Sequence, residues 1–467
     1  MRKILLITNT IVLIPLYFII GIFSISIVNW TVYFIASYVV YYILDYFISK
    51  NPASSIRARL YFSLGFYILL LFSYVGYIFS IKNGSLTDPF LIGDSSGEYG
   101  YYNLAKVISH SDSWLDQLIV AATINQPGFP LLLGNVFKYI YNDLATGYFL
   151  MLSIGLLIIY YSSKIFSILI NNKTGFAYCI LLSVLSPQII SQGIYIFKDG
   201  LVTLGILLSL LGILSAKDNE IRSLRYLLLG IVTILLFRAQ LIIFVILLFF
   251  TNIKKYFFKN ILIIPLVIFI IISVSFLGIT IKNFDLNPSY LLGFILDNNV
   301  TEEWNHIDSG ITGTIAKSIL NSNPFFRILF LPVSALIQYL LPFNIWTLNH
   351  IHPYYYIHIN ANIFWWLFVG PMVIYSFISL KNHSNTDSKN IFRLGAFMFV
   401  LIAFAYGGVI PRYYYPFMPI LIMSGSSLMA NIKQKNHLYV KYIKFKKGYY
   451  IIFLFAILLY SVFPLIT

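Results

Sequence analysis

The stretch ATGYFLMLSIGLLIIYYSSKIFSI, residues 145–168, is apolar along almost its whole length, and Lys164 is its one charged residue. A helix needs about 20 mostly apolar residues to cross the hydrocarbon core of a bilayer. Similar runs recur along the chain, at 4–28, 30–48, 60–81, 175–196, 200–216, 224–240, 241–253, 260–281, 326–343, 363–380, 391–410, 416–432 and 448–465. The run 241–253 is short, 224–253 is compatible with a tight hairpin, and 326–343 with a re-entrant or an interfacial segment, so we expect about 11 to 14 spanning helices.

The composition agrees with this interpretation. The chain has 467 residues, of which 59% are hydrophobic and 10% are charged, and its mean hydropathy is +0.83. A soluble chain has about a quarter charged residues. The sequence therefore predicts an all-α, polytopic transmembrane helix bundle that forms a single membrane domain over residues 1–467.

Two features of the sequence limit its processing and its cofactors. The first apolar run continues to about residue 28 without a small-residue cleavage site, which favours a retained first helix over a signal peptide. Cys179 is the only cysteine, which excludes a disulfide within the chain and a metal site built on several cysteines.

Charge is distributed unevenly between the two sides of the predicted bundle. Cytoplasmic loops of membrane proteins are enriched in Lys and Arg. If the helices alternate in direction, the basic tracts fall on one side: Lys50, Arg57, Arg59, Lys217, Arg222, Arg225, Lys254, Lys255, Lys259, Lys381, Lys389, Arg393 and the segment 433–447. Of the 16 acidic residues, all but Asp45, Asp218, Glu220 and Asp387 fall on the other side. The pattern predicts a cytoplasmic N-terminus, and it explains the net charge of +15 without a nucleic-acid partner.

Two long loops then face outward, at residues 82–144 and 282–326, and we expect each to carry short interfacial helices. The segment 433–447 is expected as a basic cytoplasmic loop. Any chemistry is therefore expected on the outer side, where the carboxylates gather.

The first outer loop presents two candidate catalytic carboxylates. Asp94 and Glu98 lie in the segment GDSSGEYG, residues 93–100, and a tyrosine-rich helix is expected to begin within residues 98–105. A partly desolvated carboxylate beside the bilayer can act as a general base toward a sugar hydroxyl. Alternatively, Asp94 only caps the following helix.

Other polar residues of this loop have structural interpretations. Asp112 and Asp116 are four residues apart and are expected to be solvated. The segment QPGFPL, residues 126–131, returns the chain toward the membrane, and its prolines mark a chain break or a helix start. We assign it a structural role.

Three cations are expected at outer helix ends. Lys198 precedes Asp199 and Gly200 between two apolar runs, Arg238 interrupts the run 224–240, and Arg412 stands in the segment PRYYYP, residues 411–416. A charge at membrane depth usually has a partner or a function. Lys198 and Asp199 form either a self-paired turn or part of a site, and Arg238 either extends to the interface or meets Asp199 or a lipid phosphate. Guanidinium groups suit phosphate oxygens, so the three cations are a candidate phosphate site.

A metal site is not predicted from the histidines. His350, His352 and His358 have a spacing that fits neither a helix face nor a tight metal motif, and the tyrosines between them are typical of membrane interfaces.

Taken in order, these motifs resemble the GT-C superfamily of polytopic glycosyltransferases that use polyprenyl-phosphate-linked sugars. The matching elements span roughly residues 60–432, and the segment PRYYYPFMP, residues 411–419, looks most like the Arg-Tyr and Pro signature of family 39-type enzymes. The chain departs from the superfamily because it has no Asp-X-Asp or Asp-Glu pair in the first loop. No cofactor is expected from the resemblance, and divalent metal use is left open.

The resemblance implies roles for individual residues. Asp94 would be the catalytic base, with Glu98 as the second candidate. Lys198, Arg238 and Arg412 would contact the lipid phosphate, and Asp199, Tyr99 and Tyr413 would support them. The partners would be a polyprenyl-phosphate-linked sugar, a glycan or lipid-linked acceptor, and membrane lipids.

The same resemblance implies a location in the bacterial inner membrane, with both long loops in the periplasm, and a role in surface polysaccharide synthesis (O-antigen, lipopolysaccharide or capsule). One alternative is a polymerase that joins polyprenyl-diphosphate-linked repeat units on the same face. Another is a flippase for a lipid-linked glycan, which should carry charges on many helices around a central cavity; here the intramembrane charges are few and gather at one end.

Overall fold

A computed structural model of the chain describes residues 27–83, 101–121, 128–140, 143–194, 196–216, 220–238, 241–248, 353–382, 386–406, 415–432 and 436–462. Within these ranges the only regular elements are helices, as the sequence predicts. Three of the helices are long and apolar enough to cross a membrane: Thr31–Ser49, Ile56–Tyr77 and Leu144–Ile170. The expectation of membrane-spanning helices is confirmed to this extent, and the larger number of spans stays a prediction.

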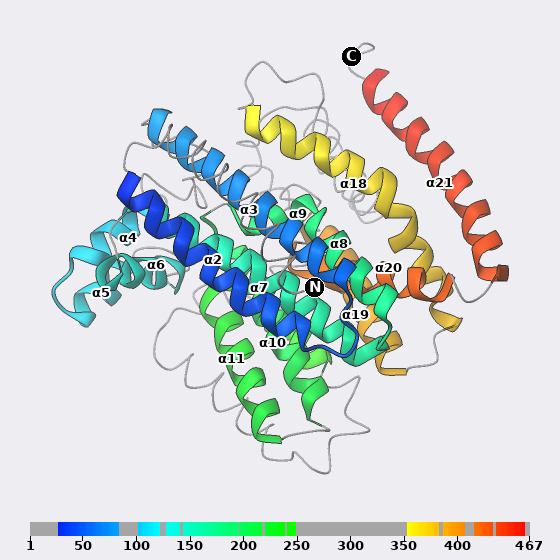
Figure 1. Cartoon of the computed structure of the whole chain (residues 1–467), viewed down its shortest axis with the longest axis horizontal. Coiled ribbons are helices and arrows are strands. Elements are labelled where there is room, and N and C mark those ends of the chain that lie inside the picture. The colour runs from blue at the N-terminus through cyan, green and yellow to red at the C-terminus, as the bar shows by residue number, and fades with distance from the viewer. Residues whose placement is uncertain are drawn as a thin grey trace, which may run out of the picture. The chain divides into compact units, whose positions relative to one another are not determined.

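The chain divides into two compact units. Unit 1 comprises 1–185 and 189–283, and unit 2 comprises 186–188 and 284–467. The described helices up to residue 238 are α2 (Ile27–Ser49), α3 (Ile56–Asn83), α4 (Tyr101–His110), α5 (Trp114–Ala121), α6 (Gly128–Tyr139), α7 (Leu144–Ile170), α8 (Lys173–Val184), α9 (Pro187–Gln192), α10 (Asp199–Ser215) and α11 (Glu220–Arg238). Figure 1 shows α4, α5 and α6 together at one edge of the view.

Two sequence expectations about helix bounds are wrong. The apolar run 175–196 is not one helix, because α8 ends at Val184 and α9 begins at Pro187. Proline lacks the backbone N–H and disfavours helical geometry in the residue before it, so a helix usually ends there. The segment 436–447, expected within a basic loop, forms the first turns of α21 (Asn436–Val462), where Lys441, Lys444 and Lys447 are exposed.

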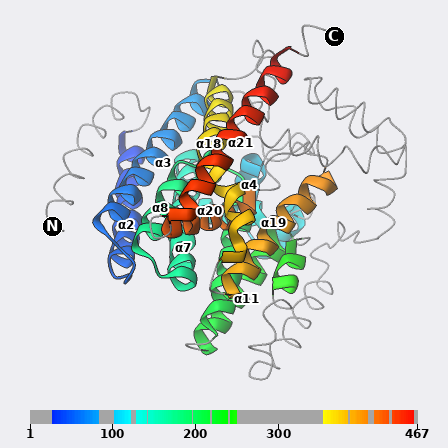
Figure 2. The same ribbon diagram turned by 90° about the vertical axis from the view of Figure 1, so that its right-hand side faces the viewer.

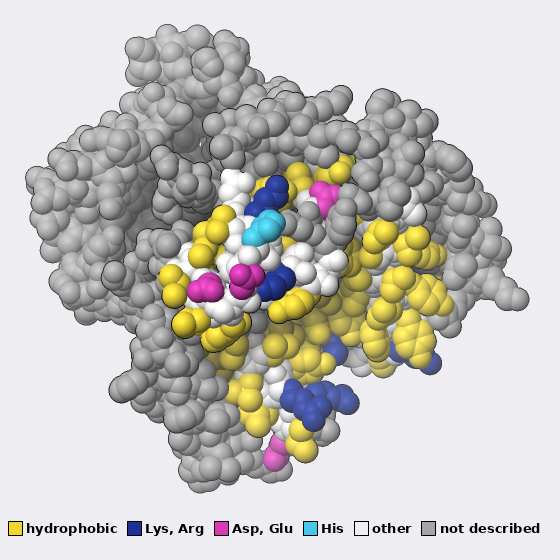
Figure 3. Space-filling view, turned by 90° about the vertical axis from the view of Figure 1, so that its left-hand side faces the viewer, with side chains coloured by type: hydrophobic (Ala, Val, Ile, Leu, Met, Phe, Trp, Pro, Cys, Tyr) yellow, Lys and Arg dark blue, Asp and Glu magenta, His cyan; other side chains and the backbone are white. Residues whose placement is uncertain are grey.

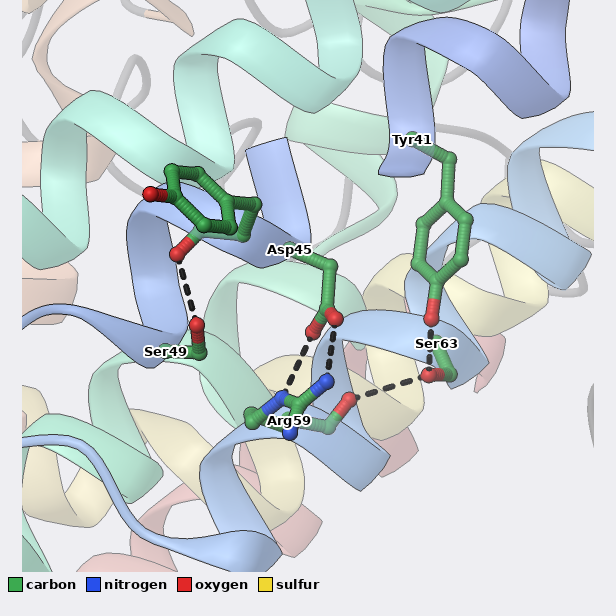
Figure 4. A network of polar contacts seen from close by, with 6 residues as sticks. Tyr41, Asp45, Ser49, Arg59 and Ser63 are labelled. Carbon is green, nitrogen blue, oxygen red and sulfur yellow. Dashed lines mark hydrogen bonds and ion pairs between the residues drawn. The ribbon is translucent and has the colours of Figure 1, made fainter. Parts of the chain in front are cut away.

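Helices α2 and α3 pack through aromatic rings and one ion pair. The Tyr41 ring stacks on Phe62 and Phe66, with centroids 5.7 and 4.7 Å away, and its hydroxyl lies 2.6 Å from Ser63 Oγ. Arg59 Nε donates to Asp45 Oδ1 at 2.9 Å, and Arg59 Nη2 contacts Oδ2 (Figure 4). The charges of both side chains are thereby compensated next to the apolar helix surfaces.

The turns with basic residues, between α2 and α3 and between α10 and α11, lie at one end of unit 1. Asn51, between α2 and α3, donates to Ser167 Oγ near the end of α7 at 2.9 Å. Lys164 of α7 lies 3.5 Å from the Tyr226 hydroxyl near the start of α11, and Ser223 donates to the Gly212 carbonyl at 2.6 Å. The tracts around Arg57 and Arg222 therefore belong to the same end of the unit, which we call the basic end.

The opposite end brings together the start of α7, the start of α10, the end of α11 and the start of α6. A Cβ at Gly147 would lie 3.0 Å from the Ile196 side chain, and a Cβ at Gly128 would clash with the backbone carbonyl of Leu236. We call this the site end, because Lys198, Asp199 and Arg238 lie here.

Unit 2 contains α18 (Pro353–Ile378), the short 3₁₀ helix η4 (Ser379–Asn382), α19 (Thr386–Tyr406), α20 (Met418–Ile432) and α21. The Ser376 and Ser424 hydroxyls, on α18 and α20, lie 2.6 Å apart. Tyr449 of α21 donates to the Trp366 carbonyl at 2.9 Å, so α21 lies along α18 (Figure 2).

Candidate functional site

The turn between α9 and α10 is held by close backbone approaches at two glycines. A Cβ at Gly200 would lie 2.8 Å from the Gln192 carbonyl oxygen, and a Cβ at Gly193 would lie 2.7 Å from the Leu69 side chain and 3.1 Å from the Cα of Gly155. The atom that a Cβ at Gly200 would meet is a backbone oxygen, so this position requires glycine, whereas the Leu69 side chain could adjust to a Cβ at Gly193. The glycine of the Lys198-Asp199-Gly200 segment thus allows the start of α10 to lie against the end of α9.

Helix α11 brings Arg238 to the start of α10. The two helices approach closely along glycines, since a Cβ at Gly212 would lie 2.7 Å from the Leu227 nitrogen and a Cβ at Gly230 would lie 2.6 Å from the Gly205 oxygen. At the site end, Arg238 Nη2 lies 3.2 Å from Asp199 Oδ1, and the two side chains are only 8% and 5% exposed. The sequence leaves Asp199 and a lipid phosphate as possible partners of Arg238, and in the structure Asp199 lies beside it.

The ion pair is close but poorly aligned. Oδ1 of Asp199 lies within ion-pair distance of Arg238 yet accepts no well-aligned hydrogen bond. Removing two charges from water is costly unless the geometry of the pair is excellent. The site end therefore holds a charged pair whose polar atoms are not fully satisfied.

Lys198 is a second buried cation beside this pair. Its residue is 3% exposed, and its Nζ lies 5.6 Å from the centre of the Tyr101 ring, within cation–π range. The pKa of Lys198 is lowered from 10.5 to about 7, mainly by burial and also by the positive charge of Arg238, whereas Asp199 acts in the opposite direction. Lys198 lies in the turn before α10, outside the three helices long enough to span a membrane.

Tyr101 connects the acidic segment of the first outer loop to the buried cations. It is the first residue of α4, and Glu98 precedes it by three positions in the sequence. Its ring packs edge-on against Phe129, with centroids 5.2 Å apart, and Phe129 in turn packs against Phe237, with centroids 6.5 Å apart. The start of α4 is thereby fixed beside the end of α11.

The segment around Gly128 has the structural role that the sequence predicts. Helix α6 begins at Gly128, and Pro130 occupies its first turn, where the missing N–H is tolerated. Phe129 fills the space between α4 and α11 and is fully buried.

Two other carboxylates of the loop lie at the surface. Asp112 and Asp116 are exposed, as expected for solvated residues. Ser113 Oγ donates to the Asp116 carboxylate at 2.6 Å and accepts from its backbone N–H at 3.0 Å, a reciprocal cap for α5. Figure 3 shows acidic, basic and histidine side chains gathered on this face and bordered by hydrophobic ones.

Several of the expected site residues lie outside the described ranges. These are Asp94, Glu98, Tyr99, Arg412 and Tyr413, together with His350 and His352. The structure thus brings together Lys198, Asp199 and Arg238, and adds Tyr101 beside Lys198.

Sequence reasoning missed Gln192 as a member of the site. The side chain is 2% exposed, and neither Nε2 nor Oε1 has a hydrogen-bond partner. Its signal in the sequence is weak, because it is one of two amides, with Gln188, in the apolar run 175–196, and it stands six residues before Lys198.

The arrangement is suited to binding an anion. Two cations, Lys198 and Arg238, lie at the first turn of α10, where the helix dipole also favours negative charge. Asp199 is the carboxylate beside Arg238 in the structure. No protein-family model, curated protein or solved structure matches the chain.

Proposed function

We propose that the chain is a membrane glycosyltransferase that moves a sugar from a polyprenyl-phosphate carrier to a glycan or lipid-linked acceptor. The reaction would take place on the outer face of the bacterial inner membrane, during synthesis or modification of a surface polysaccharide. The observation that supports this most strongly is the meeting of Lys198 and Arg238 at the N-terminal end of α10. Buried cations at a helix start, between helices of a membrane protein, suit a phosphate attached to a lipid tail.

Donor binding would exchange one anion for another. In the structure Arg238 faces Asp199, and the lipid phosphate would replace the carboxylate as the partner of Arg238 and Lys198. Arg412 is proposed as the third cation. The polyprenyl tail would lie against the apolar helices of the same unit.

The proposed chemistry is a single displacement with inversion at the anomeric carbon. The acceptor hydroxyl oxygen forms a new bond to the anomeric carbon while the bond from that carbon to the phosphate oxygen breaks. The electron pair of that bond leaves with the lipid phosphate, and Asp94 takes the hydroxyl proton, with Glu98 as the alternative base. Lys198 and Arg238 would stabilise the negative charge that develops on the leaving phosphate.

The position of Tyr101 supports a link between base and cations. Tyr101 starts α4, directly after the segment that carries Asp94 and Glu98, and its ring lies against Lys198. The acidic segment is therefore attached to the chain beside the proposed phosphate site.

The test uses purified protein in nanodiscs with a radiolabelled polyprenyl-phosphate hexose. Arg238→Ala should weaken donor binding by about 10- to 100-fold, because a hydrogen bond to a charged group contributes about 1.5–3 kcal/mol. Asp94→Asn should abolish transfer while donor binding and membrane insertion persist. Arg59→Ala is the matched control, since it removes the paired arginine at the basic end and should leave donor affinity unchanged.

Wild-type donor affinity in Arg238→Ala would remove this residue from the phosphate site, and wild-type transfer in Asp94→Asn would exclude the assigned base. The glycan of a deletion strain identifies the product. We expect loss of one sugar with chain length intact, and loss of the long-chain ladder would indicate a polymerase instead.

A further inference from the structure

Gln192 is a buried amide without a partner. It ends α9, its residue is 2% exposed, and both side-chain polar atoms lack a hydrogen bond. Buried polar groups in folded proteins are almost always paired, because leaving one unpaired costs its full desolvation penalty. An amide with both ends unpaired therefore needs an explanation.

The position of Gln192 places it at the proposed phosphate site. A Cβ at Gly200 would lie 2.8 Å from the Gln192 carbonyl oxygen and 3.5 Å from the Gln192 Cβ. The side chain of Gln192 therefore begins beside the first turn of α10. Asp199, the partner of Arg238, is the neighbouring residue in that turn.

The chemistry of the amide selects among ligands. Oε1 accepts hydrogen bonds, whereas Nε2 donates them, so satisfying both requires a ligand that can donate as well as accept. An ionised phosphodiester offers only acceptors and would leave Oε1 unpaired. Adjacent hydroxyls of a sugar supply both, because each hydroxyl can donate one hydrogen bond and accept others.

We infer that Gln192 is a substrate-binding residue that hydrogen-bonds hydroxyls of the donor sugar, next to the phosphate that Lys198 and Arg238 hold. This inference rests on the proposed function. Oε1 accepts from one hydroxyl, and Nε2 donates to a neighbouring one. The amide thus distinguishes a glycosylated carrier from the free lipid phosphate, which is the product of the transfer.

The test compares two kinds of ligand in nanodiscs. Polyprenyl phosphate reports the phosphate contacts, and a panel of polyprenyl-phosphate hexoses reports the additional affinity that the sugar provides. In Gln192→Met, which keeps the length of the side chain, this additional affinity should fall about tenfold while polyprenyl phosphate binds as in wild type. Arg238→Ala should weaken the binding of both ligands.

Gln117 offers a matched control. It is also 2% exposed and has an unpaired Oε1, but it lies in α5, which packs on α4 and α6. Gln117→Met should leave both affinities unchanged.

Thermal unfolding separates a binding role from a structural one. Without ligand, Gln192→Met should unfold at a higher temperature than wild type, because the substitution removes an unpaired buried amide. A lower unfolding temperature would mean that Gln192 supports the fold and would overturn the inference.

Two binding outcomes would also overturn the inference. In the first, wild type binds no polyprenyl-phosphate hexose of the panel more tightly than polyprenyl phosphate. In the second, Gln192→Met keeps the additional affinity for the sugar, as expected if water forms the hydrogen bonds of the amide. Failure of wild type to bind polyprenyl phosphate at all would instead refute the proposed function, together with this inference. The two failures are therefore distinguishable.

Discussion

Arg238 Nη2 lies 3.2 Å from Asp199 Oδ1, between the end of α11 and the start of α10. The second ion pair described here, Arg59 with Asp45, has a different geometry, because Nε and Nη2 of Arg59 contact both carboxylate oxygens. A two-pronged pair is well satisfied, whereas Oδ1 of Asp199 accepts no aligned hydrogen bond. We therefore expect Arg238 to exchange Asp199 for the lipid phosphate, whereas Arg59 should remain paired with Asp45.

Asp199→Asn tests this exchange. Without ligand, the variant should lose about 3 kcal/mol of unfolding free energy, because removing one partner leaves a buried charge uncompensated. Added polyprenyl phosphate should restore part of the loss by supplying a new anion. The ligand-induced rise in unfolding temperature, measured in nanodiscs, should then exceed that of wild type.

Asp45→Asn is the control for that experiment. It also breaks a largely buried pair and should lower the unfolding free energy by about 2–3 kcal/mol. Its response to polyprenyl phosphate should equal that of wild type, because Asp45 lies at the basic end. An equal response in Asp199→Asn and Asp45→Asn would contradict the exchange.

Lys198 should make donor binding depend on pH. Because burial lowers its pKa to about 7, the neutral amine predominates above that pH in the ligand-free chain. Affinity for a polyprenyl-phosphate hexose, a phosphodiester whose charge is constant from pH 6 to 9, should fall as pH rises above 7. The fall should reach about tenfold for each unit by which the bound phosphate raises the pKa of Lys198.

Stability should change with pH in the opposite sense. Between about pH 7 and the ordinary lysine pKa of 10.5, the unfolded chain binds one proton more than the folded chain at this residue. The contribution of Lys198 to the unfolding free energy therefore rises with pH in this window and is constant below it. Lys198→Arg stays protonated and should remove both dependences. Persistence of the pH-dependent affinity in that variant would assign the titration to another group.

The sequence predicts the helical, membrane-spanning character of the chain because the signal is summed over many residues. Long runs such as 145–168 and 60–81 correspond to single helices, α7 and α3. The run 175–196 is broken instead, because one proline outweighs the apolar composition around it. Hydropathy alone does not delimit the short helices α4 to α6. Helix α5, for example, begins at the local cap that Ser113 and Asp116 form.

The candidate site is predicted in part for a similar reason. Lys198, Asp199 and Arg238 stand out because a charge in an apolar run is rare, and the structure brings all three to one end of unit 1. Gln192 and Tyr101 do not stand out, because amides and tyrosines are common in such chains and only packing makes them neighbours of the site. The roles of Asp94, Glu98, Arg412, Tyr99 and Tyr413 stay predictions.

Gly128→Ala tests how the site end is held together. The added methyl would meet the Leu236 carbonyl of α11, a backbone atom that moves only with its helix. Overpacking of this kind costs about 1–3 kcal/mol, so the variant should unfold at a lower temperature and bind polyprenyl phosphate more weakly. Gly448→Ala, in α21, meets nothing within 4 Å and should be neutral or stabilising by about 0.5–1 kcal/mol. Unchanged donor affinity in Gly128→Ala would separate the α6–α11 contact from the phosphate site.

Cysteine labelling tests the topology on which the proposed chemistry depends. Cys179 is the only cysteine and is fully buried, so Cys179→Ala provides a background without thiols and leaves the protein surface unchanged. In that background Asp112→Cys, between α4 and α5, should react with a membrane-impermeant maleimide once the outer membrane alone is opened. Lys441→Cys, at an exposed position of α21, should react only after the inner membrane is permeabilised.

Labelling of Asp112→Cys from the cytoplasmic side would place the first long loop in the cytosol. Lys198 and Arg238 would then lie on the wrong face for a lipid-linked donor in the outer leaflet, because α4 and the start of α10 share one end of the unit.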